Sequence, residues 1–214
     1  MKKLVSLLLI SSLLVFSFVS CGERNREYDK EVVLSSAREL IEKSKNLNEI
    51  YWGRGISYVE DLNYSEGYYF MANPLDCKRH GFETIAELKD ITREVFSKSY
   101  CESIFNSVLS SSFSENSIAS YARYFQKFSD IEQTQPEYIM VYSRATVLLD
   151  SEVEYLYDTM YDVGSVGEVV YVMITAKVTQ DGKSQTRELK IGLIEEKDGF
   201  RIHTPTYVKY YEEN

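Results

Sequence analysis

The sequence predicts an α+β domain in which helices pack on one face of an antiparallel sheet. In residues 30–51, 84–96 and 97–109, apolar side chains recur at three- and four-residue steps, which is the period of an amphipathic helix. From about residue 137 the period changes to two, and turn sequences separate the alternating stretches. Because helices and strands occupy different parts of the chain, we expect N-terminal helices packed on a sheet of four to five strands.

Three helices account for the first part of the predicted domain. The first covers residues 30–51, with Glu and Lys opposite its apolar stripe. The second covers residues 84–96, where Thr84 and Glu87 have the spacing of a capping box. The third covers residues 97–109. The apolar positions that define the three stripes are Val33, Ala37, Leu40, Ile41, Leu47, Ile50, Ile85, Leu88, Ile91, Val95, Tyr100, Ile104, Phe105 and Val108.

Three turn sequences divide the second part of the chain into the strands of an antiparallel meander. They lie at residues 164–167, 180–183 and 197–199. The pair Asp181-Gly182 favours a two-residue hairpin, because both positions of that turn require positive φ. The three turns connect four predicted strands, which cover residues 153–163, 168–179, 185–195 and 200–208. A fifth strand, predicted before them, covers residues 137–143.

The segments between the helices and the meander are less regular. Residues 67–71 predict a short strand, and Asn73-Pro74 predicts a turn because a residue before proline avoids the helical region. Residues 110–117 have the composition of a loop. The pattern leaves residues 118–128 open between a short helix and a strand.

The N-terminus has the layout of a secretory signal peptide, with Lys2 and Lys3 before an uncharged apolar stretch. That stretch, residues 4–19, would form a helix of roughly 24 Å, which is shorter than the ~30 Å hydrocarbon core. Residues 18–22, FVSCG, then resemble the lipobox of bacterial lipoproteins, in which a small residue precedes an obligatory cysteine. The resemblance implies cleavage before Cys21 and attachment of a diacylglycerol to its thiol. The alternative is ordinary secretion, with Cys21 as a chance residue.

This layout divides the chain into a signal peptide at residues 1–20, a polar tether at residues 21–30 and a single domain at residues 31–214. Removal of the signal peptide leaves 214 − 20 = 194 residues, enough for one domain with a buried core. A lipid on Cys21 would hold this domain outside the cytoplasm. We expect it at the cell membrane, or at the outer membrane of a Gram-negative host.

The charge of the chain argues against nucleic acid as a partner. The formal net charge is −9, and removal of Lys2 and Lys3 with the signal peptide gives −9 − 2 = −11. An acidic protein repels phosphate groups, so we expect membrane contact through the N-terminal lipid and not through a basic patch. The sequence has no phosphate-binding loop, nucleophile elbow, zinc-protease motif or EF-hand loop, and no cofactor is expected.

The order of helices and hairpins over residues 30–208 resembles the NTF2-like (SnoaL-like) superfamily. The resemblance rests on the helical stripes at 33–50 and 85–95 and on the three predicted hairpins. It implies a curved sheet folded into a cone, with a pocket between helix and sheet. This superfamily includes isomerases, dehydratases, ligand-binding modules and inert scaffolds, so the fold alone assigns no function. The Tyr-rich strands beside a helix also resemble, more distantly, the secreted IseA-type inhibitors of cell-wall endopeptidases.

Four residues are candidates for chemistry in such a pocket. Asp158 and Asp162 are four residues apart and lie on one face of the predicted strand, because every second residue of a strand shares a face. Tyr142 and His203 could face the same cavity. An acid–base enzyme of this fold would need a carboxylate or histidine to move a proton and a tyrosine or second acid to stabilise an oxyanion. The alternative is that the aspartates are solvated, because a register shift of one residue reverses the strand face.

Cysteine and histidine are rare in the chain. Cys77 and His80 have a C-x-x-H spacing found in zinc sites, but no second pair follows, and no metal site is predicted. Once Cys21 is lipidated, Cys77 and Cys101 are the only remaining cysteines. They would either form a disulfide, as exported proteins often do, or remain two unpaired thiols.

Three functional hypotheses follow. The first is an envelope-anchored domain without catalytic activity that binds a small molecule, a peptide or an envelope protein. The second is a pocket enzyme of the same fold that uses Asp158 or Asp162 with Tyr142. The third is an inhibitor or accessory of cell-wall endopeptidases. Arg123 and Arg144 would either meet an anionic ligand or pair with surface acids.

Overall fold

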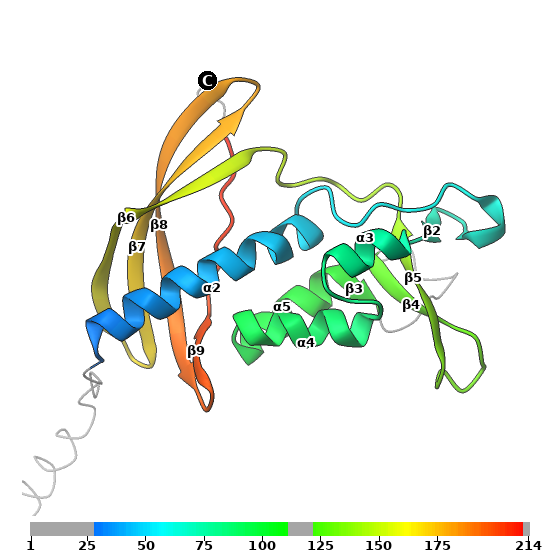
Figure 1. The fold of residues 1–214 in the computed structure, drawn as a ribbon, viewed down its shortest axis with the longest axis horizontal. Coiled ribbons are helices and arrows are strands. Elements are labelled where there is room, and N and C mark those ends of the chain that lie inside the picture. The colour runs from blue at the N-terminus through cyan, green and yellow to red at the C-terminus, as the bar shows by residue number, and fades with distance from the viewer. Residues whose placement is uncertain (1–27, 111–121, 212–214) are drawn as a thin grey trace, which may run out of the picture.

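The computed structural model describes residues 28–110 and 122–211, which form helices and two β-sheets (Figure 1). It confirms the predicted α+β class. The expected signal peptide and Cys21 lie outside the described residues, as does most of the expected tether. The helices are α2 (Lys30–Tyr51), the short 3-10 helix η1 (Leu62–Tyr64), α3 (Pro74–Arg79), α4 (Ile85–Val95) and α5 (Lys98–Val108). The strands are β1 (Ser65–Glu66), β2 (Tyr69–Met71), β3 (Leu109–Ser110), β4 (Tyr124–Phe128), β5 (Pro136–Tyr142), β6 (Glu152–Val166), β7 (Val169–Gln180), β8 (Lys183–Glu196) and β9 (Gly199–Ile202).

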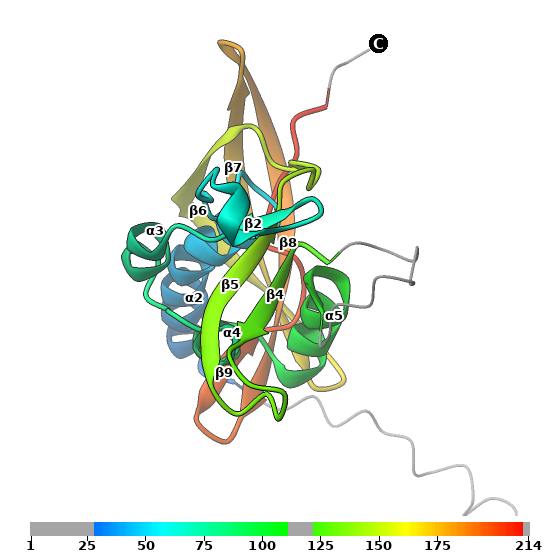
Figure 2. The same ribbon diagram turned by 90° about the vertical axis from the view of Figure 1, so that its right-hand side faces the viewer.

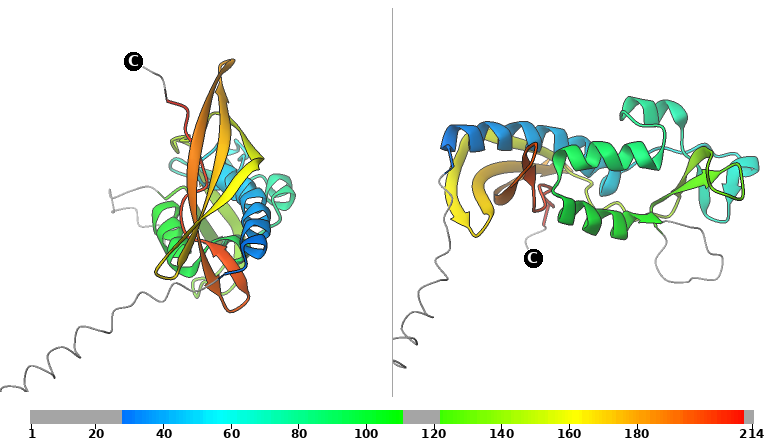
Figure 3. Two further views of the ribbon diagram at one scale, coloured as in Figure 1. Left: turned by 90° about the vertical axis from the view of Figure 1, so that its left-hand side faces the viewer. Right: turned by 90° about the horizontal axis from the view of Figure 1, so that it is seen from below.

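The long helix α2 confirms the helix predicted over residues 30–51. The carboxylate of Asp29 fixes its start by accepting hydrogen bonds from the backbone N–H groups of Glu31 and Val32. Its apolar stripe faces the four-stranded sheet, which Figure 3 shows running beside it. The residues of the stripe that are buried include Val33, Ala37, Leu40, Ile41, Leu47 and Ile50.

The shorter helices begin at recognisable capping residues. Thr84 and Glu87 form the predicted capping box of α4, each side chain accepting a backbone N–H from the other residue. The helix predicted at residues 97–109 is α5, which follows Ser97. The turn expected at Asn73-Pro74 is instead the start of α3. Asn73 caps this helix, and Pro74 occupies its first turn, where a missing N–H costs little.

The strands β6, β7, β8 and β9 form an antiparallel meander in that order. Two of its turns lie where the sequence predicted them, at residues 180–183 and 197–199. The turn predicted at residues 164–167 lies later, at 167–168, because Gly164 to Val166 are still paired strand residues of β6. In the β7–β8 turn, Asp181 and Gly182 have φ of 50° and 75°, as a two-residue hairpin with the twist of the strands requires. Alternate residues of β7 point into the core, and these are Val170, Val172, Ile174, Ala176 and Val178.

An irregularity in β6 breaks the alternation predicted for residues 153–163. Leu156 pairs with Thr175, but the next paired residue is Tyr161, opposite Met173. The hydroxyl of Thr159 bridges this gap by accepting a hydrogen bond from the Thr175 N–H at 3.0 Å. Four residues of β6 thus lie opposite a single residue of β7, so residues before and after the bulge no longer share a face by simple counting.

The second sheet has the order β1-β2-β5-β4-β3, and the β3–β4 pair is parallel. Its strand β5 corrects the prediction that residues 137–143 belong to the meander. Those residues pair with β2 and β4 and not with β6. The structure places β4 within residues 118–128, for which the sequence left a helix and a strand open, and so favours the strand. Residues 118–121 lie outside the described residues, and so does most of the loop predicted at 110–117. Figure 2 shows β4 and β5 in front of the helices.

The last strand is shorter than predicted. The sequence pattern extends it from residue 200 to residue 208, but β9 ends at Ile202. Pro205 has no N–H to donate to a sheet, and the Thr204 hydroxyl accepts a hydrogen bond from the Gly192 N–H at 2.9 Å. Residues 203–211 therefore form an irregular segment, called the C-terminal tail below.

The main core lies between α2, α4, α5 and the four-stranded sheet, and one contiguous cluster of buried side chains connects these elements. One face of the five-stranded sheet adds Tyr124, Ile139 and Val141 to this cluster. A separate small cluster of Tyr69, Phe125 and Met140 lies on the five-stranded sheet. Within residues 28–110 and 122–211, no helix is long and apolar enough to cross a membrane.

Candidate functional site

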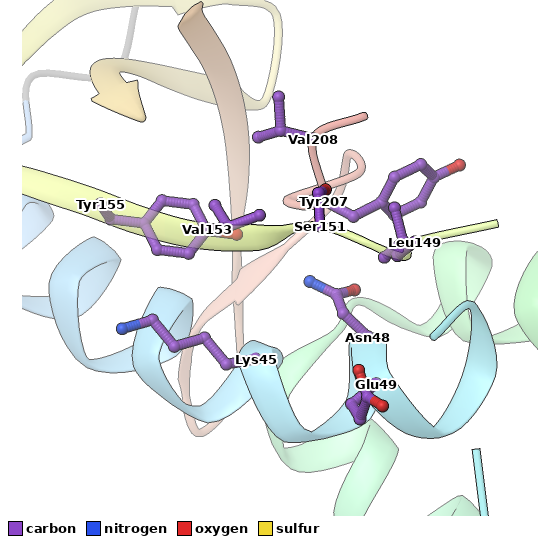
Figure 4. Close-up of a pocket in the computed structure, with 9 residues that line it drawn as sticks. All are labelled: Lys45, Asn48, Glu49, Leu149, Ser151, Val153, Tyr155, Tyr207 and Val208. Atoms are coloured by element: carbon purple, nitrogen blue, oxygen red, sulfur yellow. The ribbon is translucent and has the colours of Figure 1, made fainter. Parts of the chain in front are cut away.

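A pocket opens where the C-terminal half of α2 faces the start of β6, and we call it the α2–β6 pocket (Figure 4). Lys45, Asn48 and Glu49 share one face of α2, because residues three and four apart are neighbours on a helix. The connection into β6, the strand itself and the C-terminal tail complete the lining. These lining residues are Leu149, Ser151, Val153, Tyr155, Tyr207 and Val208.

The size of the α2–β6 pocket limits what it can hold. Its cavity volume is about 160 Å³. Sites for drug-sized ligands and cofactors enclose roughly 300–1,000 Å³, so this cavity fits a group of about the size of one amino-acid side chain. Aliphatic and aromatic side chains form most of its wall, while Lys45 and Glu49 supply one charge of each sign.

A buried polar network holds the C-terminal tail against α2 beneath this pocket. Thr206 has no exposed surface, and its hydroxyl lies 2.8 Å from the Ser44 hydroxyl. The Asn48 amide donates a second hydrogen bond to the same hydroxyl at 3.0 Å. The Tyr155 hydroxyl donates to the Thr206 carbonyl at 2.7 Å. These bonds join helix, sheet and tail, and they hold in place Asn48 and Tyr155, which line the pocket.

The charged groups of the pocket already have partners within the chain. The Lys45 ammonium lies 2.7 Å from the Glu42 carboxylate and 5.3 Å from the centre of the Tyr155 ring. Its hydrogen bond to Glu42 lowers the pKa of that carboxyl. Glu49 accepts a hydrogen bond from the Arg54 N–H at 3.0 Å. Burial raises the pKa of Tyr155, which keeps its hydroxyl protonated.

The aspartates proposed for acid–base chemistry do not line this pocket. Asp158 is exposed, on the bulged part of β6. The side chain of Asp162 is 14% exposed, accepts the Gly164 N–H at 2.9 Å and lies 3.5 Å from the Lys30 ammonium. The two do not form the shared strand face that the sequence pattern suggested, because the bulge interrupts the alternation. Tyr142 lies on β5, in the other sheet, beside the ring of Tyr69.

His203 is held by two serines at the start of α5. Its Nδ1 lies 2.9 Å from the Ser97 hydroxyl and 3.4 Å from the Ser99 hydroxyl. A serine beside a histidine can act as a nucleophile, but only 1% of Ser97 is exposed, so a substrate does not reach it. His203 therefore connects the C-terminal tail to α5, and the structure does not bring it together with Tyr142, Asp158 or Asp162.

Cys77 and Cys101 are both free and buried, which is the second of the two alternatives left open by the sequence. They lie on different helices, α3 and α5, and the Cys101 thiol donates to the Phe96 carbonyl at 3.2 Å. Burial raises the pKa of each thiol to about 11, so both are protonated near neutral pH. Throughout the described part of the chain, no three His, Cys, Asp or Glu side chains gather as metal ligands would.

His80 and Asp76 belong to a polar cluster that ties α3 to its surroundings. The Nδ1 atom of His80 lies 2.5 Å from the Asn46 side-chain oxygen on α2. Asp76 accepts hydrogen bonds from both the N–H and the hydroxyl of Ser57, at 2.8 and 2.7 Å. Burial alone would raise the pKa of Asp76, but the Ser57 hydrogen bonds together with Arg79 and His80 lower it.

Arg123 has a role that the sequence did not suggest. It is 7% exposed, and its guanidinium donates to the carbonyls of Tyr51 at 3.0 Å and Gly53 at 2.6 Å. It thus caps the C-terminal end of α2, where unpaired carbonyls and the helix dipole favour a cation. This corrects the expectation of an anionic ligand or a surface acid as its partner. Arg144 is exposed and stacks over the Tyr68 ring at 3.6 Å.

The sequence pattern did not identify the α2–β6 pocket, although α2 contains a signal for it. Ser44 and Asn48 are polar residues four positions apart on a stripe that is otherwise apolar. Buried polar groups require hydrogen-bond partners, so these positions indicate a polar contact from elsewhere in the chain. The contact comes from Thr206, which is 158 residues after Asn48, and no local pattern indicates which segment supplies it.

No protein-family model matches the chain, and no curated protein matches its sequence.

Proposed function

We propose that this chain is an exported, lipid-anchored protein of the cell envelope whose α+β domain binds a protein or peptide partner at the α2–β6 pocket. The size and lining of that pocket carry the proposal. A cavity of about 160 Å³ with aromatic and aliphatic walls accepts one anchoring side chain of a partner. Protein interfaces commonly use a few such anchors in small pockets surrounded by a polar rim.

The fold assignment within this proposal is an NTF2-like domain. A long helix beside one face of an antiparallel meander supports it, as the sequence resemblance implies. In such a fold the space between helix and sheet is where a reaction chamber would lie. Here one contiguous cluster of buried side chains, which includes Tyr155 and Val208 of the C-terminal tail, packs α2 against the sheet. Binding at the α2–β6 pocket is therefore favoured over catalysis in an interior chamber.

The chemistry of the pocket also favours binding over acid–base catalysis. An acid–base enzyme needs two groups that are free to exchange a proton within reach of one substrate. The pocket carboxylate Glu49 accepts a backbone N–H, and the Lys45 ammonium pairs with Glu42. Both groups remain able to meet a charged atom at the rim of an interface, where they would orient a partner.

Photocrosslinking in the native envelope tests the binding proposal. A photoreactive residue replaces Glu49 at the pocket rim, and a control replaces Glu39, which is exposed on the same helix. We expect a discrete protein adduct from position 49 and none from position 39. Adding Ser151→Trp fills the pocket and should remove that adduct. Equal adducts at both positions, or an adduct that survives Ser151→Trp, would contradict the proposal.

The same variants separate a protein partner from a small ligand. Native mass spectrometry of the purified full-length protein would reveal a retained compound. A compound that is lost in Ser151→Trp, without any protein adduct at position 49, would replace the protein partner by a small molecule.

The lipid anchor has an independent test. We expect the mature protein to gain the mass of a diacylglycerol-modified Cys21 and to fractionate with membranes. Cys21→Ser should abolish both properties. A membrane-bound mature form of unchanged mass in Cys21→Ser would contradict lipidation at this residue.

A further inference from the structure

Four exposed apolar side chains gather at one end of the domain, and we call them the apolar rim. Val32 lies in the first turn of α2, and Tyr161, Val163 and Val166 lie in the second half of β6. Their exposed fractions range from 49% to 60%. Tyr161 and Val166 pair with Met173 and Val169 of β7, so they lie on the sheet face opposite the buried Val170 and Val172. Single exposed apolar residues are normal, and several at one end of a domain give that edge a less polar character.

Two contacts place the rim beside the start of the described chain. The Lys30 ammonium at the start of α2 lies 3.5 Å from Asp162, between Tyr161 and Val163. The Tyr28 ring lies 5.7 Å from the ring of Phe200, at the start of β9. Figure 1 shows the start of α2, the β6–β7 turn and the β8–β9 turn at the same end of the molecule.

The proposed lipid would bring a bilayer to this end. Tyr28 is 28 − 21 = 7 residues after Cys21, and seven extended residues span at most about 25 Å. An acylated Cys21 therefore holds Tyr28, at the same end of the domain as the rim, within about 25 Å of the lipid surface. We propose that the apolar rim rests on the bilayer and inserts Tyr161, Val163 and Val166 among the lipid headgroups. This inference depends on the lipid anchor of the proposed function.

The charges near the rim determine the kind of lipid contact. Lys30 and Lys190, the latter two strands from Tyr161 on the same sheet face, are accompanied by the acidic residues Glu31, Asp162 and Glu168. This mixed, net acidic surface does not attract anionic lipid. The contact is therefore apolar, and it should be as strong on phosphatidylcholine as on phosphatidylglycerol vesicles.

The contact would orient the domain on the membrane, whereas the acyl chains would supply most of the membrane affinity. Glu49 lies 17 residues after Val32 on α2, which is about 25 Å along the helix axis. With the rim on the bilayer, the α2–β6 pocket is held away from the lipid. The membrane contact thus presents the pocket to partners in the surrounding compartment.

Depth-dependent fluorescence quenching tests this orientation. The full-length lipoprotein, with Trp52→Phe to remove the native tryptophan, carries Val163→Trp at the rim. The control carries Leu75→Trp, at an exposed apolar position on α3. Both are reconstituted in phosphatidylcholine vesicles with brominated acyl chains. We expect Trp emission at position 163 to shift to the blue and to be quenched, while emission at position 75 keeps its intensity and wavelength.

The outcomes distinguish the rim from the anchor. Mass spectrometry first establishes whether Cys21 carries the acyl group. An acylated protein with equal emission and quenching at positions 163 and 75 overturns the rim and leaves the anchor intact. A protein without the acyl group overturns both. Quenching at position 163 that requires phosphatidylglycerol would also overturn the apolar contact, because it would indicate an electrostatic one.

Discussion

The two sheets of this protein are built from similar residues but differ in how far apart in the sequence their paired strands lie. Each strand of the four-stranded sheet pairs with its neighbour in the sequence, and β6, β7 and β8 have 15, 12 and 14 residues. In the five-stranded sheet no strand is longer than seven residues, and Tyr69 of β2 pairs with Tyr142, 142 − 69 = 73 positions later. Distant pairing costs more loop-closure entropy for each hydrogen bond gained.

This difference suggests that the sheets depend on different interactions. The four-stranded sheet buries alternate residues of β7 and β8 in the main core against α2. The five-stranded sheet contributes Tyr124, Ile139 and Val141 to the same core from one face, and its other face has a small cluster of Tyr69, Phe125 and Met140. It also relies on two side chains of its strand region, Arg123 and Tyr124, which bind the C-terminal end of α2. We therefore expect the five-stranded sheet to open locally at a lower free energy than the four-stranded one.

Truncating one core side chain in each sheet should give the largest losses in the free energy of unfolding, and the two losses should differ. Leu193 is 0% exposed in the main core and Met140 is 1% exposed in the small cluster. We expect Leu193→Ala to lower the free energy of unfolding by about 4 kcal/mol and Met140→Ala by about 2–3 kcal/mol. Urea denaturation followed by circular dichroism would measure both changes.

Hydrogen exchange would show where each truncation acts. Leu193→Ala should reduce the protection of amides throughout the domain. Met140→Ala should accelerate exchange mainly in β2, β4 and β5. Equal loss of protection in β7 from both variants would mean that the two sheets unfold as one unit, and the comparison would fail.

The same difference explains how much of the fold the sequence could predict. The α2 helix, the capping box at Thr84 and the Asp181-Gly182 hairpin depend on residues close in sequence, and all three predictions are confirmed. The assignment of residues 137–143 to the meander was wrong, because β5 pairs with strands that its own pattern does not specify. An alternating pattern predicts a strand but does not identify its partner.

The candidate site was less predictable than the fold. The bulge at residues 157–160 depends on the Thr159 side chain replacing a backbone partner, which the alternation of apolar residues does not reveal. Asn48, which lines the α2–β6 pocket, bonds to Thr206, and such a pairing is not visible in a single sequence. Ser44 and Asn48 on a buried stripe were the one local indication that a polar partner had to exist.

Arg123 provides a test of the connection between the two regions. Arg123→Met keeps most of the side-chain volume but leaves the carbonyls of Tyr51 and Gly53 without their charged donor. We expect a loss of about 2–3 kcal/mol in the free energy of unfolding, because buried carbonyls without a partner are costly. Thermal and urea denaturation would measure the change.

Arg144 supplies the matched control for that variant. It is exposed, and its guanidinium stacks on Tyr68 at 3.6 Å. Arg144→Met should change the free energy of unfolding by less than about 1 kcal/mol, as expected for an exposed cation–π contact. If Arg123→Met and Arg144→Met lower the free energy of unfolding equally, the Arg123 cap on α2 contributes no more than a surface contact.

The Thr206 network provides a smaller test, within the four-stranded region. Thr206→Val keeps the shape of the side chain but removes the hydroxyl that meets Ser44 and Asn48. We expect a loss of about 1–2 kcal/mol in the free energy of unfolding, since the Asn48 amide is left buried without that partner. Thr179→Val is the control, because the Thr179 hydroxyl bonds to Ser184 at an exposed position. A smaller loss for Thr206→Val than for Thr179→Val would contradict a role for the network in holding the tail.

The smallest expected effect concerns Asp76, and it depends on pH. Asp76→Asn weakens the two hydrogen bonds from Ser57, at a cost of about 1 kcal/mol near neutral pH. The pKa of Asp76 is lowered in the folded state, so its contribution is present above the unfolded pKa and is lost as pH falls through the folded pKa. The stability difference between the native protein and Asp76→Asn should therefore shrink below about pH 4. Urea denaturation at several pH values would measure it, with Asp198→Asn in the exposed β8–β9 turn as the control for the loss of one carboxylate. A difference that stays constant down to pH 3 would mean that the Asp76 charge does not contribute to stability.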